Sequence, residues 1–158
     1  ILMDIESTGY KMFSSYLDEL QSMCNLSLID DKRKEFLFSE IQRYEFSRWV
    51  NVIANGNIVG FFIIGTGENC HPDADYYIQE AYIQPEYRRK GYMSYAISEY
   101  VKRHGGIYCL LILNKNYIAK TFWSEVFRKL GYTPRPLSDV GATDEDCQQY
   151  GFEPKGMG

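Results

Sequence analysis

A basic turn at the start of a helix is the clearest chemical feature of the chain. Three consecutive cations, Arg88-Arg89-Lys90, precede Gly91 and a segment whose apolar residues recur at helical spacing. Backbone N–H groups at a helix start, with cations beside them, can bind the oxygens of a pyrophosphate. Gly91 has no side chain, so the backbone can approach such an anion closely. The turn therefore predicts an anion site; an exposed helix start without a ligand is the alternative interpretation.

Four elements predicted from hydrophobic patterns surround this turn. The segment Tyr76–Gln84 is rich in aromatic and β-branched residues, which predicts a strand leading into the turn. Apolar residues recur at helical spacing over Tyr92–His104, and again in a segment that Asn116 can cap and Gly131 can end. Between these two helices, Ile107–Leu113 is a continuous apolar run and predicts a strand buried on both faces.

The preceding part of the chain has first helical and then strand-like patterns. Apolar spacing predicts helices over Ser7–Met23 and Asp30–Tyr44. The apolar runs Trp49–Ala54 and Ile58–Ile64 flank Asn55-Gly56, a pair that tolerates the positive φ angles of a tight turn. These runs predict a β-hairpin.

The order of these elements is typical of an α/β domain with a mixed sheet. The segment 133–158 holds three of the five prolines and is expected to be irregular, with short edge strands such as Gln148–Phe152. A length of 158 residues suits one core. We therefore expect a single domain, with a helical segment at 1–48, a core at 49–132 and the irregular segment.

Composition excludes several classes of protein. With 45% hydrophobic and 24% charged residues the chain has ordinary globular proportions, and no run approaches the roughly 18 apolar residues that a membrane span needs. The opening ILMDIEST lacks the basic and apolar regions of a signal peptide, so we expect a cytoplasmic protein. The four cysteines form no C-x-x-C pair and no cluster at zinc-like spacing, so we expect free thiols and no metal.

Charge is unevenly distributed along the chain. Residues 1–79 carry a net charge of −6, residues 80–133 carry +5, and residues 134–158 carry −3, which gives the total of −4. A positive centre between negative flanks suits an anionic cofactor held centrally and a cationic partner approached by the flanks. Solvated helix faces are the alternative interpretation of the same counts.

The basic turn also resembles a known signature. The acyl-CoA-binding signature of the GNAT superfamily of N-acyltransferases reads (Gln or Arg)-x-x-Gly-x-(Gly or Ala), and here Arg88 and Gly91 match it while Met93 departs from it. The family's late helix and its terminal Gly-aromatic pair are similar to Asn116-x-x-Ala119, Phe122-Trp123 and Phe127-x-Lys129-Leu130-Gly131-Tyr132. The resemblance covers roughly residues 49–132.

This resemblance implies a fold and a cofactor. The fold is α/β, with a GNAT-type mixed, mostly antiparallel central sheet that is flanked by helices and splayed between its fourth and fifth strands. The cofactor is acetyl-CoA as acyl donor, with its pantetheine arm along the strand that ends at Tyr82 and Ile83 and its diphosphate on the turn from Arg88 to Met93. The implied binding residues are Tyr82, Ile83, Arg88, Arg89, Lys90, Gly91, Tyr92, Met93, Asn116 and Ala119.

Acyl transfer to an amine also needs groups that accept and donate protons. Glu80 lies three residues before Ile83, at the position where many relatives carry a glutamate base. Relatives commonly place a tyrosine on the last helix as the acid, but the aligned positions here hold Trp123 or Phe127. Tyr117 is the nearest hydroxyl and is the candidate acid, with water as the alternative.

The expected function is therefore N-acetyl transfer from acetyl-CoA to a primary amine of a cationic small molecule or a protein. A non-catalytic member that binds acyl-CoA or a protein partner is the alternative, because the usual tyrosine is missing. We expect no nucleic-acid partner, since the only basic segment is the presumed cofactor site. A monomer or a homodimer is expected.

Overall fold

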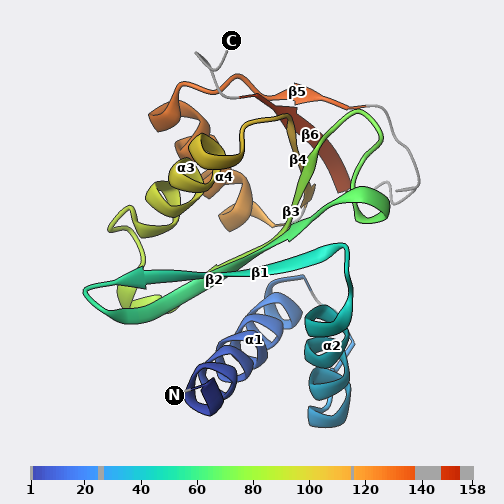
Figure 1. Ribbon diagram of the computed structural model, residues 1–158, viewed down its shortest axis with the longest axis vertical. Helices are drawn as coiled ribbons and strands as arrows, with labels where there is room; N and C mark the ends of the chain where they lie inside the picture. Colours follow the sequence, from blue (N-terminus) through green and yellow to red (C-terminus); the bar gives the residue numbers. More distant parts are fainter. Residues whose placement is uncertain (1, 25–26, 115, 138–146, 154–158) are drawn as a thin grey trace.

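The computed structural model describes residues 2–24, 27–114, 116–137 and 147–153, in which one sheet separates two pairs of helices (Figure 1). Helices α1 and α2 cover one face of the sheet, and α3 and α4 cover the other. The elements in chain order are α1 (Leu2–Cys24), α2 (Asp31–Arg43), β1 (Ser47–Ala54), β2 (Asn57–Gly65), the 3₁₀ turn η1 (Gly67–Asn69), β3 (Tyr76–Ile83), the 3₁₀ turn η2 (Pro85–Tyr87), α3 (Tyr92–His104), β4 (Tyr108–Leu113), α4 (Tyr117–Leu130), β5 (Arg135–Pro136) and β6 (Cys147–Phe152).

The sheet has the strand order β1-β2-β3-β4-β6-β5. Only β3 and β4 pair in parallel, and every other neighbouring pair is antiparallel. The mixed, mostly antiparallel sheet expected from the sequence is thus confirmed. The predicted hairpin is also present, with Asn55 and Gly56 at φ angles of 51° and 79° in its turn.

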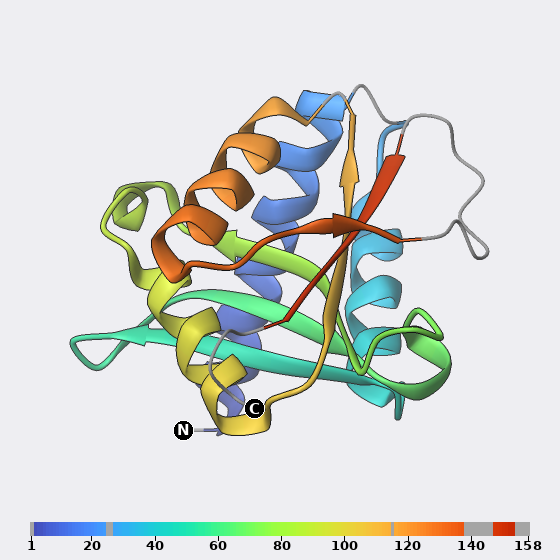
Figure 2. The same ribbon diagram turned by 90° about the horizontal axis from the view of Figure 1, so that it is seen from above.

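The two parallel strands separate after a short paired stretch. Backbone pairing joins Tyr76–Ile78 to Tyr108–Leu110 and then stops, while β3 continues to Ile83 and β4 to Leu113 (Figure 2). The residues Gln79–Ile83 therefore form an edge of β3 that is not paired with β4. The family resemblance implies a splay between the fourth and fifth strands. In this chain the described part begins with two helices, and the splay lies between the third and fourth strands, β3 and β4.

A bulge in β3 changes the direction of its side chains. Ile63 of β2 pairs with Glu80 and Ile64 pairs with Ile78, so Gln79 is an extra residue without an opposite partner. A bulge breaks the regular alternation of side chains along a strand. As a result, Ile78 packs into the core beneath α3 and α4, while Tyr82 packs into the core beneath α1.

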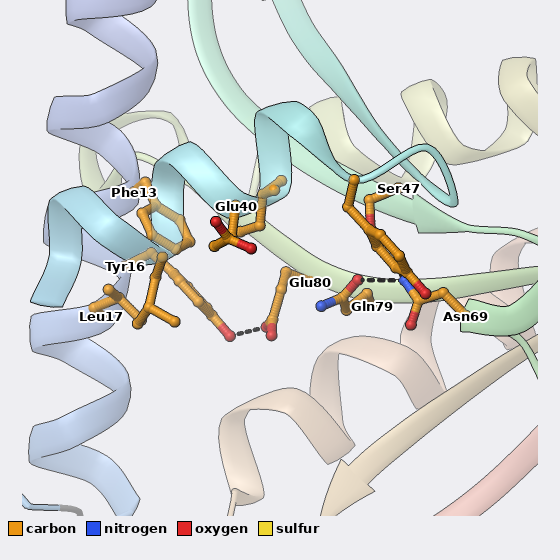
Figure 3. A pocket seen from close by; sticks show the side chains of 11 residues that line it. Phe13, Tyr16, Leu17, Glu40, Ser47, Asn69, Gln79 and Glu80 are labelled. Carbon is orange, nitrogen blue, oxygen red and sulfur yellow. Dashed lines mark hydrogen bonds between the residues drawn. The ribbon is translucent and has the colours of Figure 1, made fainter.

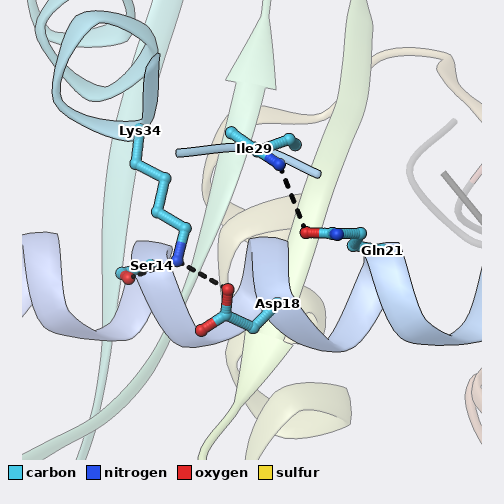
Figure 4. A network of polar contacts seen from close by, with 5 residues as sticks. All are labelled: Ser14, Asp18, Gln21, Ile29 and Lys34. Carbon is cyan, nitrogen blue, oxygen red and sulfur yellow. Dashed lines mark hydrogen bonds and ion pairs between the residues drawn. The ribbon is translucent and has the colours of Figure 1, made fainter. Parts of the chain in front are cut away.

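Helices α1 and α2 are joined by a buried lysine (Figure 4). The side chain of Lys34, 7% exposed, donates from its Nζ to Ser14 Oγ at 3.1 Å and to Asp18 Oδ1 at 2.6 Å. The N-terminus of α2 is capped by Asp30, whose Oδ1 accepts from the Arg33 N–H at 2.8 Å. A lysine is rarely buried unless it is paired, so this contact fixes how the two helices meet.

Two boundaries differ from the sequence prediction. Helix α1 begins at Leu2 rather than at Ser7, because the preceding residues include no Gly or Pro that would stop a helix. The predicted edge strand near the C-terminus is β6, which pairs with both β4 and β5 and so lies inside the sheet; the short β5 is at the edge. The described parts of this segment, residues 133–137 and 147–153, therefore contain two paired strands.

Two of the general expectations concern membrane spans and cysteine thiols. No helix in the described ranges is long and apolar enough to cross a membrane. Cys70 and Cys109 carry free thiols, whereas the side chains of Cys24 and Cys147 lie outside the described part of the structure.

Candidate active site

A pocket of about 330 Å³ lies between α1, α2 and the sheet (Figure 3). Its helical side is mainly apolar, and its sheet side is polar. The described residues that line it are Phe13, Tyr16, Leu17, Leu37, Glu40, Ile41, Tyr44, Ser47, Asn69, Gln79 and Glu80.

Glu80, the predicted base, lies in this pocket. The Tyr16 hydroxyl of α1 donates a hydrogen bond to Glu80 Oε2. The Tyr16 ring is held edge-on against Phe61 and Tyr82, with ring centroids 6.0 and 6.1 Å apart. The bulge at Gln79 and this aromatic contact together direct the Glu80 carboxyl toward the face of the sheet that α1 and α2 cover.

The protonation of Glu80 is strongly altered by its surroundings. Burial disfavours the charged carboxylate and raises the pKa of Glu80 from an ordinary value of 4.5 to about 8. The hydrogen bond from Tyr16 favours the ionised form and so acts in the opposite direction. A carboxyl with a pKa near 8 can exchange protons with an amine near neutral pH far better than an ordinary glutamate.

A group of amide and hydroxyl side chains lies beside Glu80. Asn69 donates from Nδ2 to Ser47 Oγ and to Gln79 Oε1, both at 3.0 Å. A side chain at Gly65 would meet the Asn69 carbonyl oxygen at 2.2 Å, so the close approach of η1 to the end of β2 requires glycine there. This amide cluster, Ser47, Asn69 and Gln79, therefore forms a fixed polar wall.

The basic turn has the backbone of an anion site. Arg89 and Gly91 have φ angles of 63° and 81°, and left-handed residues in such a turn form a concavity of N–H groups that can bind anions. The guanidinium of Arg88 is already engaged: its Nε donates to Ile83 O at 2.8 Å and its Nη2 to Glu19 Oε2 at 2.7 Å. Arg89 and Lys90 are exposed, so their charges are the ones available to a ligand.

The other predicted cofactor residues have varied positions. The Tyr82 ring is buried beneath the Arg88 guanidinium, whose Cζ is 5.4 Å from the ring centroid. Met93 is 3% exposed and packs into the core, so its side chain does not cover the turn. Ile83 and Tyr92 are partly buried against the same core.

The start of α4 is fixed as predicted. Asn116 caps the helix by accepting from the Ala119 N–H at 3.0 Å. Both residues follow the end of β4, beyond the point where β3 and β4 separate.

The candidate acid is less well placed. Tyr117 is 73% exposed and is absent from the described residues that line the pocket. The Lys120 Nζ lies 5.5 Å from its ring centroid. Trp123 and Phe127, at the positions where relatives carry a tyrosine, are both buried in the core.

Among the described residues that line the pocket, sequence reasoning identifies only Glu80 as a site residue. Tyr16 and Glu40 lie within the two predicted N-terminal helices and Gln79 within the predicted strand Tyr76–Gln84, with no role in the site predicted for them. Tyr16 belongs to an apolar stripe, which gives no sign that its hydroxyl meets a carboxylate. The bulge that exposes Gln79 depends on pairing with β2, and a single strand sequence does not show it.

The described residues contain no group of three or more His, Cys, Asp or Glu side chains that could hold a metal ion. The segment Cys70–Asp75, which brings such residues together in sequence, is instead a loop before β3. In it, His71 is buried and its Nδ1 accepts from the Asp73 N–H at 3.0 Å.

One known protein family matches most of the chain. The model of the Acetyltransferase (GNAT) family matches residues 11–132. Among curated proteins, none matches the chain.

Several solved structures share the fold. An acetyltransferase from Thermus thermophilus superposes with a TM-score of 0.66 at 16% identity, over 92% of this chain and 88% of that one. The diaminobutyrate acetyltransferase EctA from Paenibacillus lautus, in complex with L-2,4-diaminobutyric acid and coenzyme A, gives a TM-score of 0.61 at 12% identity, over 94% and 89%. The PaiA N-acetyltransferase from Thermoplasma acidophilum, in complex with coenzyme A, gives 0.57 at 13%, over 95% and 93%.

Proposed function

Because the chain belongs to the GNAT acetyltransferase family, we propose that it transfers an acetyl group from acetyl-CoA to the primary amine of a cationic acceptor bound beside Glu80. The observation that carries this proposal is the position of Glu80, whose carboxyl has a pKa raised to about 8 and lies in a pocket large enough for a small molecule. The relative from Paenibacillus lautus acts on a small diamino acid, which is consistent with an acceptor of this size.

The residues present fit acetyl-CoA. The edge Gln79–Ile83 is free of β4 and can pair with an extended pantetheine arm, as a peptide pairs with an open sheet edge. The turn from Arg88 to Met93 would hold the diphosphate through its N–H groups and through the charges of Arg89 and Lys90. Arg88 would support this turn through Ile83 O rather than by direct contact.

The chain's own residues would bind the amine and move its proton. Acetyl-CoA, when bound, supplies the thioester that the amine attacks. The amine must be neutral to attack, and the nitrogen loses a further proton as the C–N bond forms and the C–S bond breaks. Glu80 would accept a proton, and the hydrogen bond from Tyr16 would hold its carboxyl in place. Tyr117 remains the candidate for donating a proton to the departing thiolate, with water as the alternative.

The test is thiol release from acetyl-CoA with a panel of primary amines, for the wild type and for Glu80→Gln. The substitution keeps the shape and removes only the proton acceptor, so we expect turnover to fall about tenfold to a thousandfold while CoA affinity is nearly unchanged. Glu45→Gln, an exposed change of the same charge outside the pocket lining, is the matched control. Unchanged turnover of Glu80→Gln between pH 6 and 9 would assign Glu80 a structural role.

A non-catalytic acyl-CoA-binding protein is the second candidate. It is favoured by the buried Trp123 and Phe127, neither of which has a hydroxyl to donate a proton. Tight acetyl-CoA binding by calorimetry, together with no thiol release for any amine in the panel, would identify this alternative.

A further inference from the structure

The described pocket lining has acidic groups and no basic ones, so near neutral pH it can carry only negative charge. Glu80 lies on the sheet side and Glu40 on the α2 side, and both carboxyls point into the pocket (Figure 3). None of the described residues that line the pocket is Lys, Arg or His. A bound anion would therefore face two carboxyl groups and no cation among the described lining residues, since Arg43 lies outside the lining and is paired with Glu40, which is unfavourable.

Glu40 is available to a cationic ligand. Its Oε1 accepts from Arg43 Nη2 at 3.2 Å, but both side chains are more than half exposed. Exposed ion pairs of this kind contribute little, about 0–1 kcal/mol. An ammonium group entering the pocket can compete with Arg43 for the Glu40 carboxylate.

The apolar part of the lining suits a hydrocarbon chain. Phe13 and Leu17 of α1 and Leu37 and Ile41 of α2 all line the pocket, and these four side chains form its apolar helical side. A volume of about 330 Å³ is at the lower end of the range for small-molecule sites, which is roughly 300–1,000 Å³. The pocket therefore matches a short aliphatic body better than a bulky polycyclic amine.

We propose that this pocket selects a small aliphatic diamine, with one amine at Glu80, the second at Glu40, and no carboxylate. The inference rests on the proposed function and narrows its acceptor. It excludes free amino acids, whose carboxylate would meet only acidic and neutral side chains among the described lining residues. It also ranks a small diamine above a lysine of a polypeptide, since Glu40 interacts with a second cation that a single lysine side chain lacks.

Four probes of similar size test the preference for a second amine and the exclusion of a carboxylate. Cadaverine differs from n-pentylamine only by the second amine, and from lysine only by the carboxylate. Lysinamide keeps the size of lysine without its negative charge. We expect kcat/KM for acetyl transfer to cadaverine to exceed that for n-pentylamine and for lysine by about tenfold or more each, and lysinamide to recover most of the loss. Lysine as the best acceptor, or a lysine-containing peptide better than cadaverine, would overturn the proposal.

The role of Glu40 is tested by Glu40→Gln against Glu35→Gln. Both substitutions lie on α2 and remove one exposed carboxylate, but only Glu40 lines the pocket. Glu40→Gln should reduce the preference for cadaverine over n-pentylamine to about twofold or less, chiefly through KM, while Glu35→Gln keeps it. If both variants show the same preference for cadaverine over n-pentylamine, Glu40 does not bind the second amine.

Binding measured without acetyl-CoA separates this inference from the proposed function. Cadaverine, n-pentylamine and lysine are titrated into the protein by calorimetry. If no amine is acetylated but cadaverine still binds about tenfold more tightly than the other two, the transfer reaction is wrong and the selectivity of the pocket stands. If all amines are acetylated with equal efficiency and bind equally, the transfer reaction stands and the selectivity is wrong.

Discussion

The Tyr16 hydroxyl of α1 donates a hydrogen bond to the Glu80 carboxyl of β3 across 64 residues of sequence. This contact joins the first helix to the strand that carries the candidate base. It also opposes the effect of burial, since a hydrogen bond donated to a carboxylate stabilises the charged form. The pKa of about 8 for Glu80 follows from its burial.

Replacing Tyr16 by Phe should change the pH dependence of the reaction. Without the donated hydrogen bond the ionised form of Glu80 is less stable, so its pKa should rise further above about 8. The rising limb of the pH–rate profile should move upward by about one unit, with activity at pH 7.5 reduced several-fold and largely recovered at high pH.

The control for this variant is Tyr10→Phe. Tyr10 is also on α1, but its ring packs edge-on against Phe38 at 5.7 Å and it is absent from the described pocket lining. A uniform loss of rate at every pH in Tyr16→Phe would instead indicate that Tyr16 only supports the packing of α1. The pKa of Glu80 measured by infrared spectroscopy, without substrate, would test the contact independently of turnover.

Glu80 should also make the stability of the protein depend on pH. The folded protein keeps the Glu80 proton up to about pH 8, whereas the unfolded chain loses it near 4.5. The folded state therefore binds more protons between these values, and this contribution to stability is lost as pH rises. Because Glu80 is only partly buried, solvent screening reduces the effect, so we expect a loss on the order of 2–4 kcal/mol over this range.

Urea unfolding of the wild type and of Glu80→Gln at pH 5 and pH 8 measures this contribution. When the free energies of unfolding of the two proteins are subtracted, the contributions of the other titrating groups cancel. The free energy of unfolding of Glu80→Gln relative to that of the wild type should increase as the pH rises from 5 to 8, because only the wild type loses the contribution of Glu80. Parallel pH dependences for the two proteins would mean that the pKa of Glu80 is close to its ordinary value.

The sequence predicted those parts of the fold that local residues determine. Helices α3 and α4 begin and end where the pattern placed them, because Gly91 and Gly131 adopt positive φ angles that few other residues tolerate and the Asn116 side chain caps the start of α4. The hairpin is predictable for the same reason, because Asn55 and Gly56 in its turn adopt positive φ angles. The conformation of the basic turn is predictable for the same reason, since a basic run and a glycine before a helix are visible in one stretch of sequence.

The features that the sequence did not predict depend on contacts between distant residues. The bulge at Gln79 arises from pairing with β2, and it brings Gln79 into the same pocket as Glu80. The engagement of Arg88 with Glu19 joins residues 69 positions apart. The internal position of β6 depends on pairing with both β4 and β5, which no pattern within its own residues specifies.

The three cations of the basic turn should have separable roles. Arg88 is bound to Ile83 O and Glu19, and its side chain is 35% exposed, so Arg88→Ala should lower the free energy of unfolding by about 1–2 kcal/mol. Arg89 and Lys90 are exposed. The double variant Arg89→Ala/Lys90→Ala should leave stability nearly unchanged and weaken CoA binding by about tenfold, with a smaller dependence on salt.

Calorimetry with CoA and urea unfolding of both variants decide between these roles. The opposite pattern, in which Arg88→Ala loses CoA affinity without losing stability, would show that Arg88 leaves Glu19 to contact the diphosphate.

Two buried tyrosines of the core beneath α3 should respond in opposite ways to loss of their hydroxyl groups. Tyr108 is fully buried between the rings of Tyr76 and Phe152, with centroids 5.0 and 5.5 Å away, and its hydroxyl has no hydrogen-bond partner in the described structure. The Tyr100 hydroxyl, by contrast, accepts from Arg48 Nη1 at 3.3 Å. An unpaired buried hydroxyl is destabilising, whereas a paired one contributes about 0.5–1.5 kcal/mol.

Tyr108→Phe should therefore raise the free energy of unfolding by about 1 kcal/mol, and Tyr100→Phe should lower it by a similar amount. Urea unfolding of both variants at one pH gives the comparison directly. Both changes keep the aromatic ring, so the stacking of Tyr108 on its two neighbours and the edge-on contact of Tyr100 with Phe62 at 5.6 Å are retained. A loss of stability in Tyr108→Phe equal to that in Tyr100→Phe would contradict the prediction, because it would mean that the Tyr108 hydroxyl is paired in solution.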